Sequence, residues 1–351
     1  MNRKWAIVMA ILRIGLPPAC WGMLLFPSTE VFAQYSWGKV YEQRPGLGLS
    51  FLPVLPDLPN PFGYAPGIVH APGSARFRLD NQGNILVNDM EQISILNPAT
   101  HELKAVRSDV NGYPYLTRFW LGPHDEIYAR LRKAGTGSIA PQYRVVRFLK
   151  EGNTYKRDNT FELAESGGPP IAMNFGPNGD IYVRTSSDMA THNKFASNGD
   201  FLGSVSSVTE TSGGIKISLK YQQVNHEWVT LGVRIDDGRE LFQIPGYCDI
   251  VKATYHNTIM LYDRLPDTIP LSDTLNLINF KILIYVVDCG TGENEVIDPY
   301  NDCVDRDFAY RTVAHVDFNY NGDIYASIIY FDEPGELTGK EKLVVYKWQT
   351  R

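Results

Sequence analysis

One short phrase occurs four times in this chain, and it limits the possible folds more than any other feature. Each copy places a polar turn between two runs of residues that favour β-strands: Leu79–Val87, Leu121–Ala129, Phe175–Val183 and Phe318–Ala326. Such a turn needs a residue with positive φ, which Gly adopts without steric cost, so each phrase predicts a β-hairpin. Hairpins that recur at intervals of about 40 to 50 residues predict a β-propeller.

The spacing of the turns predicts six blades, each a sheet of four antiparallel strands. Aligned on their turn residues, the four phrases follow one another by 42, 54 and 143 residues. The last step is close to three ordinary steps, so two less regular blades must lie within it. We place their hairpins at Val224–Val229 and Tyr255–Leu261.

The end of the chain predicts how the ring is closed. Leu343–Tyr346 is the third strand of the last blade, and too few residues follow it to form a fourth. A ring that left this strand unpaired would expose a sheet edge. We therefore expect Trp37–Tyr41 to pair beside it, which gives an all-β six-bladed propeller closed by an N-terminal strand.

The phrase at 176–183, Gly-Pro-Asn-Gly-Asp-Ile-Tyr-Val, resembles NHL repeats. It also resembles the wider group of six-bladed propellers that includes gluconolactonase-like and streptogramin-lyase-like proteins. The resemblance covers four blades clearly and two poorly. It implies the fold but selects no activity, because this group holds lactonases, lyases and binding scaffolds alike.

Residues 1–33 predict a signal peptide. Basic residues precede the apolar run Ile14–Phe26, and Val31–Ala33 fits a small-residue cleavage site. Translation from Met9 instead of Met1 would give a more typical basic start. An uncleaved anchor is the alternative, but no apolar run reaches about 20 residues. We expect a secreted or periplasmic protein with no membrane span after cleavage.

Residues 34–351 are expected to fold as one propeller domain. The formal net charge of -6 makes a nucleic-acid partner unfavourable. Within this domain, residues 42–71 are rich in Pro, which lacks the backbone donor that a central strand needs. We expect this segment to run over the surface and cap one end of the channel, the alternative being an extended segment that binds a protein partner.

Export would place the three remaining cysteines in an oxidising compartment. Cys289 and Cys303 bracket a 13-residue insertion, Gly290–Asp302. A disulfide across that loop would contribute about 3 kcal/mol in the chain-entropy model. We predict this pair, with Cys248 as a buried free thiol.

The stretch 288–307 is dense in carboxylates, which are the ligands that calcium prefers. Its spacing does not match an EF-hand loop. A solvated acidic loop is therefore the favoured interpretation, and a divalent cation such as calcium is the alternative cofactor.

Polar residues on the innermost strands predict a ligand site. Positions five and seven before each turn residue alternate with apolar ones and should face the channel. One interpretation is a small anionic ligand held by arginines; the other is that each cation pairs with a carboxylate of a neighbouring blade, such as Asp317. The candidate ligand-binding residues are Arg76, Arg78, Arg118, Trp120, Asn174 and Lys252.

The catalytic candidates are His315 and Asp317, which lie two residues apart on an innermost strand and so point to the same side. We expect an exported binding or scaffold propeller that recognises a small anionic ligand or a protein partner at the channel mouth. The alternative is a lactonase- or lyase-type enzyme with a polar, metal-containing site at one end of the channel.

Overall fold

The structure is a computed structural model of the 351-residue chain. It describes residues 35–43, 77–88, 92–100, 102–107, 110–133, 142–163, 169–176, 178–185, 191–206, 209–211, 213–246, 248–270, 276–332 and 342–350. The predicted signal peptide, the Pro-rich segment beyond residue 43 and Arg76 lie outside the described residues. Residues 35–351 form one compact unit.

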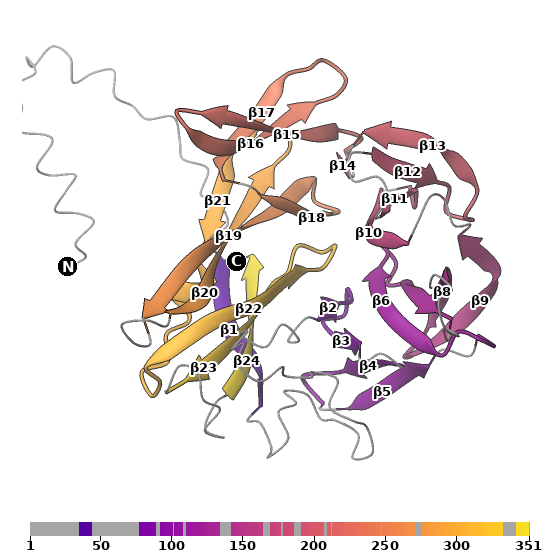
Figure 1. The fold of residues 1–351 in the computed structure, drawn as a ribbon, viewed down its shortest axis with the longest axis horizontal. Coiled ribbons are helices and arrows are strands. Elements are labelled where there is room, and N and C mark those ends of the chain that lie inside the picture. The colour runs from indigo at the N-terminus through magenta and orange to yellow at the C-terminus, as the bar shows by residue number, and fades with distance from the viewer. Residues whose placement is uncertain are drawn as a thin grey trace, which may run out of the picture. The chain divides into compact units, whose positions relative to one another are not determined.

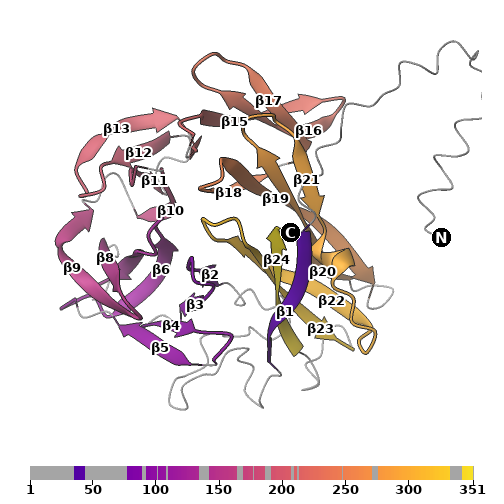
Figure 2. The same ribbon diagram turned by 180° about the vertical axis from the view of Figure 1, so that it is seen from behind.

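The predicted six-bladed propeller of four-stranded antiparallel sheets is confirmed (Figures 1 and 2). Blades 1 to 5 each run in chain order from the innermost strand outward, and blade 6 takes its outermost strand from the N-terminal side. The strands are β2 (Arg78–Leu79), β3 (Ile85–Asn88), β4 (Gln92–Leu96) and β5 (Leu103–Arg107) in blade 1; β6 (Tyr115–Leu121), β7 (Ile127–Arg132), β8 (Tyr143–Glu151) and β9 (Thr154–Leu163) in blade 2; β10 (Pro170–Phe175), β11 (Ile181–Thr185), β12 (Thr191–Phe195) and β13 (Phe201–Ser206) in blade 3; β14 (Thr209–Glu210), β15 (Lys216–Val224), β16 (Glu227–Arg234) and β17 (Glu240–Pro245) in blade 4; β18 (Asp249–Ala253), β19 (Thr258–Pro270), β20 (Asn276–Asp288) and β21 (Asn294–Ile297) in blade 5; β22 (Tyr310–Phe318), β23 (Ile324–Phe331), β24 (Lys342–Thr350) and β1 (Tyr35–Gln43) in blade 6.

The two innermost strands of every blade are joined by the same turn. Its fourth residue donates its backbone N–H to the carbonyl of the first and has positive φ, as expected for a type I turn with a following left-handed residue. We call this end of the blades the turn end, and the end at which the innermost strands begin the base end. The positive-φ residues are Gly83, Asp125, Gly179, Gly214, Asn257 and Gly322.

This shared turn corrects the predicted position of blade 4. The hairpin at Val224–Val229 is real, but it joins the second and third strands of that blade. The innermost hairpin of blade 4 turns at Gly214, after the strand Thr209–Glu210. A two-residue strand carries no alternating pattern, so the sequence offered only the longer hairpin beyond it.

The predicted ring closure is confirmed. Strand β1 pairs antiparallel with β24 and places Trp37 opposite Trp348 and Gln43 opposite Leu343. The Trp37 ring also packs edge-on against Tyr346, with 5.3 Å between ring centroids. The outermost strand of blade 6 is therefore supplied from the N-terminal side of the chain (Figure 2).

Apolar side chains between neighbouring blades form the core. Shared hydrophobic clusters join blade 1 to 2, 2 to 3, 4 to 5, 5 to 6 and 6 to 1. Among the described residues, no cluster contains members of both blade 3 and blade 4. The seam between these two blades therefore differs from the other five.

The predicted disulfide between Cys289 and Cys303 is wrong for this structure, in which both are buried free thiols, as is Cys248. The residues between them do not form one loop. They form the hairpin into β21 and then the short helix α2 (Pro299–Asp302), which takes Cys303 to another side of the blade. Cys289 packs in the core shared with blade 4, whereas Cys303 packs in the core shared with blade 6.

The acidic stretch 288–307 serves the local structure. The Asp298 side chain caps α2 by accepting from the Asn301 N–H, and Asp305 pairs with Lys342. In the described part of the chain, no group of three His, Cys, Asp or Glu residues is placed to hold a metal ion. None of the described helices is long and apolar enough to cross a membrane.

The closure makes a direct prediction. A chain that begins after Gln43 should melt several degrees below one that begins at Tyr35, because it exposes the β24 edge and the indole of the buried Trp348. Adding the peptide 35–43 should restore the melting temperature. The same peptide with Val40→Asp is the control, since Val40 packs against the core between blades 6 and 1. Equal melting of the two chains, measured by circular dichroism, would contradict the closure.

Candidate functional site

A buried carboxylate joins the innermost strands of three consecutive blades. Asp317 on β22 accepts from Arg78 Nη1 at 3.0 Å and from the Leu79 backbone N–H at 2.9 Å, both on β2. Lys252 on β18 lies 3.8 Å away on the other side. Arg78, Lys252 and Asp317 stand at the same position, five residues before the positive-φ residue of their turns. The repeat therefore brings them to one depth, where blades 5, 6 and 1 meet.

The charges in this cluster stabilise one another's ionised forms. Burial opposes ionisation of Asp317, but Lys252 and Arg78 outweigh it and lower the pKa of the carboxyl below its ordinary value. Burial lowers the pKa of Lys252, and Asp317 works against that change. The Lys252 ammonium also donates to the Phe318 carbonyl and lies 5.0 Å from the Tyr320 ring centroid. Of the two sequence interpretations, this contact set favours the ion pair between blades for Arg78 and Lys252.

The catalytic candidates are placed together but have structural contacts. His315 Nε2 lies 2.9 Å from the Phe77 carbonyl oxygen, which can only accept, so this nitrogen is the donor. The His315 ring also packs edge-on against Phe77, at 5.1 Å between centroids. With Asp317 committed to Arg78 and Leu79, these contacts assign the pair to the joint between blades 6 and 1.

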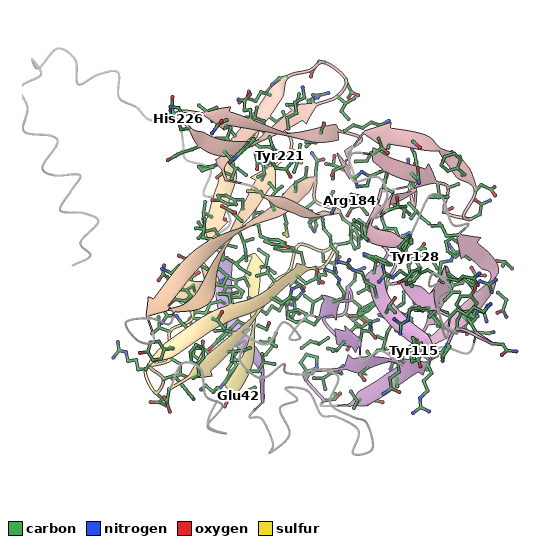
Figure 3. All side chains as sticks on the ribbon, in the orientation of Figure 1. Glu42, Tyr115, Tyr128, Arg184, Tyr221 and His226 are labelled. Carbon is green, nitrogen blue, oxygen red and sulfur yellow. The ribbon has the colours of Figure 1, made fainter. Side chains whose placement is uncertain are left out.

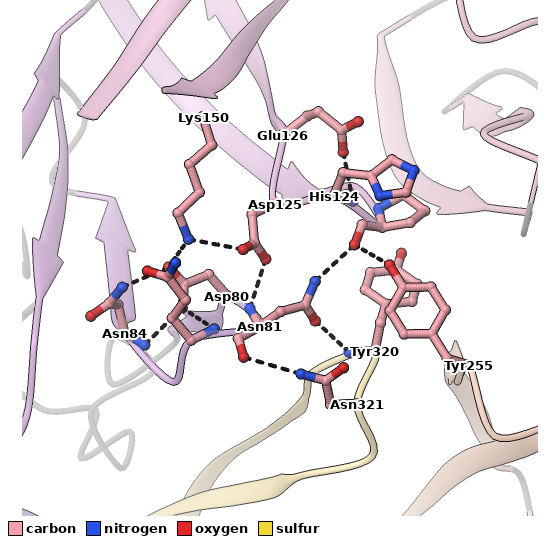
Figure 4. Close-up of polar contacts among 12 residues, drawn as sticks. Asp80, Asn81, Asn84, His124, Asp125, Glu126, Lys150, Tyr255, Tyr320 and Asn321 are labelled. Atoms are coloured by element: carbon pink, nitrogen blue, oxygen red, sulfur yellow. Dashed lines mark hydrogen bonds and ion pairs between the residues drawn. The ribbon is translucent and has the colours of Figure 1, made fainter. Parts of the chain in front are cut away.

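The turn end of the ring is filled by the protein's own side chains (Figure 4). Asn81 in blade 1 donates its side-chain amide to the Pro123 carbonyl of blade 2 at 2.7 Å and accepts from the Tyr320 N–H of blade 6 at 3.1 Å. The Tyr255 hydroxyl of blade 5 donates to the same Pro123 carbonyl. Lys150 bridges the carboxylates of Asp80 and Asp125 at 2.9 and 2.8 Å. These contacts link turns of four blades.

The remaining predicted ligand residues lie elsewhere. Trp120 is buried in the core between blades 2 and 3, where Arg118 lies over its ring at 5.7 Å from the centroid. Asn174 is half-buried on β10, opposite Tyr182. The innermost polar positions therefore serve three different environments instead of one basic channel mouth.

A cluster of arginines and aromatic rings lies at the base end of blade 2, and of its members only Arg118 was a ligand candidate from the sequence. On the side of this sheet that faces blade 3, Arg118 stands directly opposite Arg130. In the next row, Arg132 stands between Tyr115 and Tyr143. Arg132 lies over the Tyr115 ring and Arg130 over the Tyr143 ring, each at 5.0 Å from the centroid. The alternation of arginines along β7, a second strand, was the available signal.

The contacts of two of these arginines are to neutral groups. Arg130 donates from Nε to Thr117 Oγ1 at 2.9 Å and from Nη1 to the Pro170 carbonyl at 2.7 Å. The contact of Arg132 is the Tyr115 ring. Within the described residues, neither guanidinium forms an ion pair with a carboxylate. Burial lowers the pKa of Arg130, as expected for a cation whose surroundings carry no compensating negative charge.

The fold and these clusters define a six-bladed β-propeller with a polar interior. No protein-family model and no curated protein sequence matches the chain. Solved structures match the chain at low sequence identity. A chain of the mitotic checkpoint complex aligns with 95% of this chain and 97% of its own length, at 10% identity and a TM-score of 0.44.

Two further solved structures are similar in the same sense. A candidate oxidoreductase (glucose dehydrogenase) from Thermus thermophilus covers 90% of this chain and all of its own, at 11% identity and a TM-score of 0.38. A candidate gluconolactonase covers 55% of this chain and 72% of its own, at 14% identity and a TM-score of 0.35. The likeness is one of fold alone.

The buried carboxylate predicts a large and specific loss of stability. Asp317→Asn should lower the free energy of unfolding by about 3–5 kcal/mol, because it leaves the buried Lys252 and the half-buried Arg78 without their anion. Glu102→Gln is the control, since it removes an exposed ion pair to Lys104 worth at most about 1 kcal/mol. Urea unfolding of both variants measures the difference. A loss for Asp317→Asn no larger than that of the control would contradict the assigned role.

The same residue predicts a pH dependence. The folded-state pKa of Asp317 is lowered, so its contribution is fully present above the unfolded value of about 3.9 and is lost as pH falls through the folded value. The stability difference between parent and Asp317→Asn should therefore stay constant from pH 7 to about 4 and shrink only at lower pH. Urea midpoints across this range test the sign, and a difference that shrinks already near pH 5 to 6 would contradict it.

Proposed function

We propose that this chain is a binding propeller that takes a small anionic ligand at the base end of blade 2, through Arg118, Arg130 and Arg132. The observation that carries the proposal is that Arg118 and Arg130 stand directly opposite one another while the contacts of Arg130 and Arg132 are to neutral groups. Like charges directly opposite on neighbouring strands destabilise a sheet. An anion bound between them would accept hydrogen bonds from both guanidinium groups.

The chemistry of the side chains suits such a ligand. A guanidinium that lies over an aromatic ring keeps its edge, with paired N–H donors, available to a carboxylate or phosphate. The rings of Tyr115 and Tyr143 restrict Arg132 and Arg130 in this way. Pre-ordered donors lose less conformational entropy when a ligand binds.

Three lysines of the protein differ from Arg130 and Arg132, because each has a carboxylate partner. Lys150, Lys194 and Lys347 each lie within 3.1 Å of a carboxylate. Those pairs lie near the turn end, where the ring is cross-linked by its own side chains. The base end of blade 2 differs from these pairs, because Arg130 and Arg132 form no ion pair within the described residues.

The proposal also includes the expected export of the protein and the class of partner that it binds. A secreted or periplasmic propeller of this kind would recognise a free small anion, or a protein partner that presents a carboxylate or phosphate group. The enzyme alternative, of lactonase or lyase type, gains no support from His315 and Asp317, whose contacts hold blades together.

Citrate should raise the melting temperature of the parent protein by about 2 °C or more relative to sodium chloride at equal ionic strength, because a ligand that binds only the folded state stabilises it. Arg132→Gln should lose this increase while its melting temperature in chloride stays close to that of the parent. Arg306→Gln is the charge-matched control, since Arg306 is exposed in the loop before β22. Scanning fluorimetry measures all three.

Two outcomes would reject the proposal. One is a parent protein whose melting temperature responds equally to citrate, phosphate and chloride. The other is an increase that Arg132→Gln retains in full. Turnover of a lactone substrate by the parent protein would favour the enzyme instead.

A further inference from the structure

The seam between blades 3 and 4 is joined by polar contacts. The apolar cluster of Val229, Leu231 and Val233 belongs to blade 4, and no described residue of blade 3 is a member of it. Glu210 on β14 is almost fully buried and reaches Lys194 of blade 3 at 3.9 Å. A Cβ on Gly176 would lie 3.2 Å from Glu210 Oε2, so glycine lets this carboxylate approach blade 3.

One buried polar atom on the blade 3 side of this seam, Arg184 Nε, has no hydrogen-bond partner within the described part of the chain. Arg184, labelled in Figure 3, and Tyr182 are alternate residues of β11, so the period of the strand places both side chains on the same face of the sheet. Burial raises the pKa of Tyr182, and the hydrogen bond between its hydroxyl and the Glu210 carboxylate raises it further, so Tyr182 already has a partner across the seam. Buried donors without partners are rare in folded proteins and require an explanation.

Because the blades repeat, Arg184 can be compared with the equivalent arginine of blade 2. Arg130 occupies in β7 the position that Arg184 occupies in β11. Arg130 is satisfied by Thr117 Oγ1 and by the Pro170 carbonyl of the next blade. The residue of blade 3 equivalent to Thr117 is Ile171, which has no hydroxyl. The lost partner is therefore a difference in sequence between two blades that share one backbone pattern.

The residues opposite this face differ from those in blade 2. Ala172 stands opposite Arg184, whereas the equivalent position in blade 2 holds Arg118. Asn174 stands opposite Tyr182 and adds an amide to the same face. The side chain opposite Arg184 is therefore smaller than its equivalent in blade 2, and the next row of the same face is polar.

The charges around the seam fix the charge of a fitting ligand. Lys194 pairs with Asp180 at 2.7 Å, and Lys216 pairs with Glu210 at 3.4 Å. Each of these lysines has a carboxylate partner, and Arg184 forms no ion pair within the described residues. One positive charge therefore remains, which a single negative charge would balance.

We propose that the seam between blades 3 and 4 is a second binding site, for a small monocarboxylate held by Arg184. The carboxylate accepts from the guanidinium, and the Asn174 amide and Tyr182 hydroxyl lie on the same face as further hydrogen-bonding groups. A carboxylate bound here would accept from Arg184, as Thr117 Oγ1 accepts from Arg130 in blade 2. The site is separate from the one on blade 2 and does not rest on it.

The first test compares equivalent substitutions in two blades. Arg184→Met should melt no lower than the parent protein in buffer without carboxylates, because it removes a buried donor that has no partner. Arg130→Met should melt several degrees lower, because its guanidinium has two. A several-degree loss for Arg184→Met would show that Arg184 supports the fold, and would overturn the proposal.

The second test measures hydrogen exchange by mass spectrometry in peptides that cover β11 and β14–β15. Acetate should slow exchange there by about twofold or more relative to chloride at equal ionic strength, because ligand binding raises the free energy of local opening. Arg184→Met should lose this protection. Arg132→Gln should retain it. The test therefore distinguishes a missing anion site on blade 2 from a missing carboxylate site at the seam.

Three results would overturn the proposal. No protection by acetate in the parent protein would remove the site. Protection that Arg184→Met retains would remove Arg184 from it. Equal protection by phosphate at a pH where it is a dianion would reject the assignment to a monocarboxylate.

Discussion

The inner ring of this propeller depends on one buried carboxylate. Without Asp317, the cations Lys252 and Arg78 would lie near one another at the junction of blades 5, 6 and 1 with no anion between them. Desolvating a carboxylate is costly, and it is compensated here by two cations and a backbone N–H. The pairing of β1 with β24 lies at the opposite, outer edge of blade 6. The charge cluster and the closing strand therefore stabilise the inner and outer edges of one blade.

The six blades combine a constant backbone with variable chemistry. All six use the same turn, but the residue five places before its positive-φ position changes from blade to blade. That position holds a cation, an anion, an aromatic ring, an amide or a hydroxyl, and each choice sets the environment of one inner strand. The series from blade 1 to blade 6 is Arg78, Trp120, Asn174, Thr209, Lys252 and Asp317.

The features that the sequence predicted are local and repeated. Each turn requires a residue with positive φ, so Gly83 could be assigned to a turn from the sequence alone. Blade 6 lacked an outer strand, so Trp37–Tyr41 could be assigned to that position. The structure was less predictable where the repeat is weak. Blade 4 begins with a strand of two residues, and β21 lies inside what looked like an insertion next to Cys289.

The candidate sites were predictable only in part. The sequence placed Arg78, Lys252 and Asp317 at equal depth, but it could not decide between a bound ligand and an ion pair, because that depends on distances between blades. The arginines of β7 lie on a second strand, outside the innermost positions that the repeat predicts to face the channel. The importance of Arg184 follows from a missing partner, which only the three-dimensional structure reveals.

Pairing between Gln43 and Leu343 has a consequence for how the molecule is assembled. Contacts between residues so far apart in sequence form slowly, because a long loop must be ordered first. During synthesis, five blades can form local hairpins before β24 exists, while β1 has no partner. The first strand of the propeller to be synthesised, β1, is therefore the last to join its sheet.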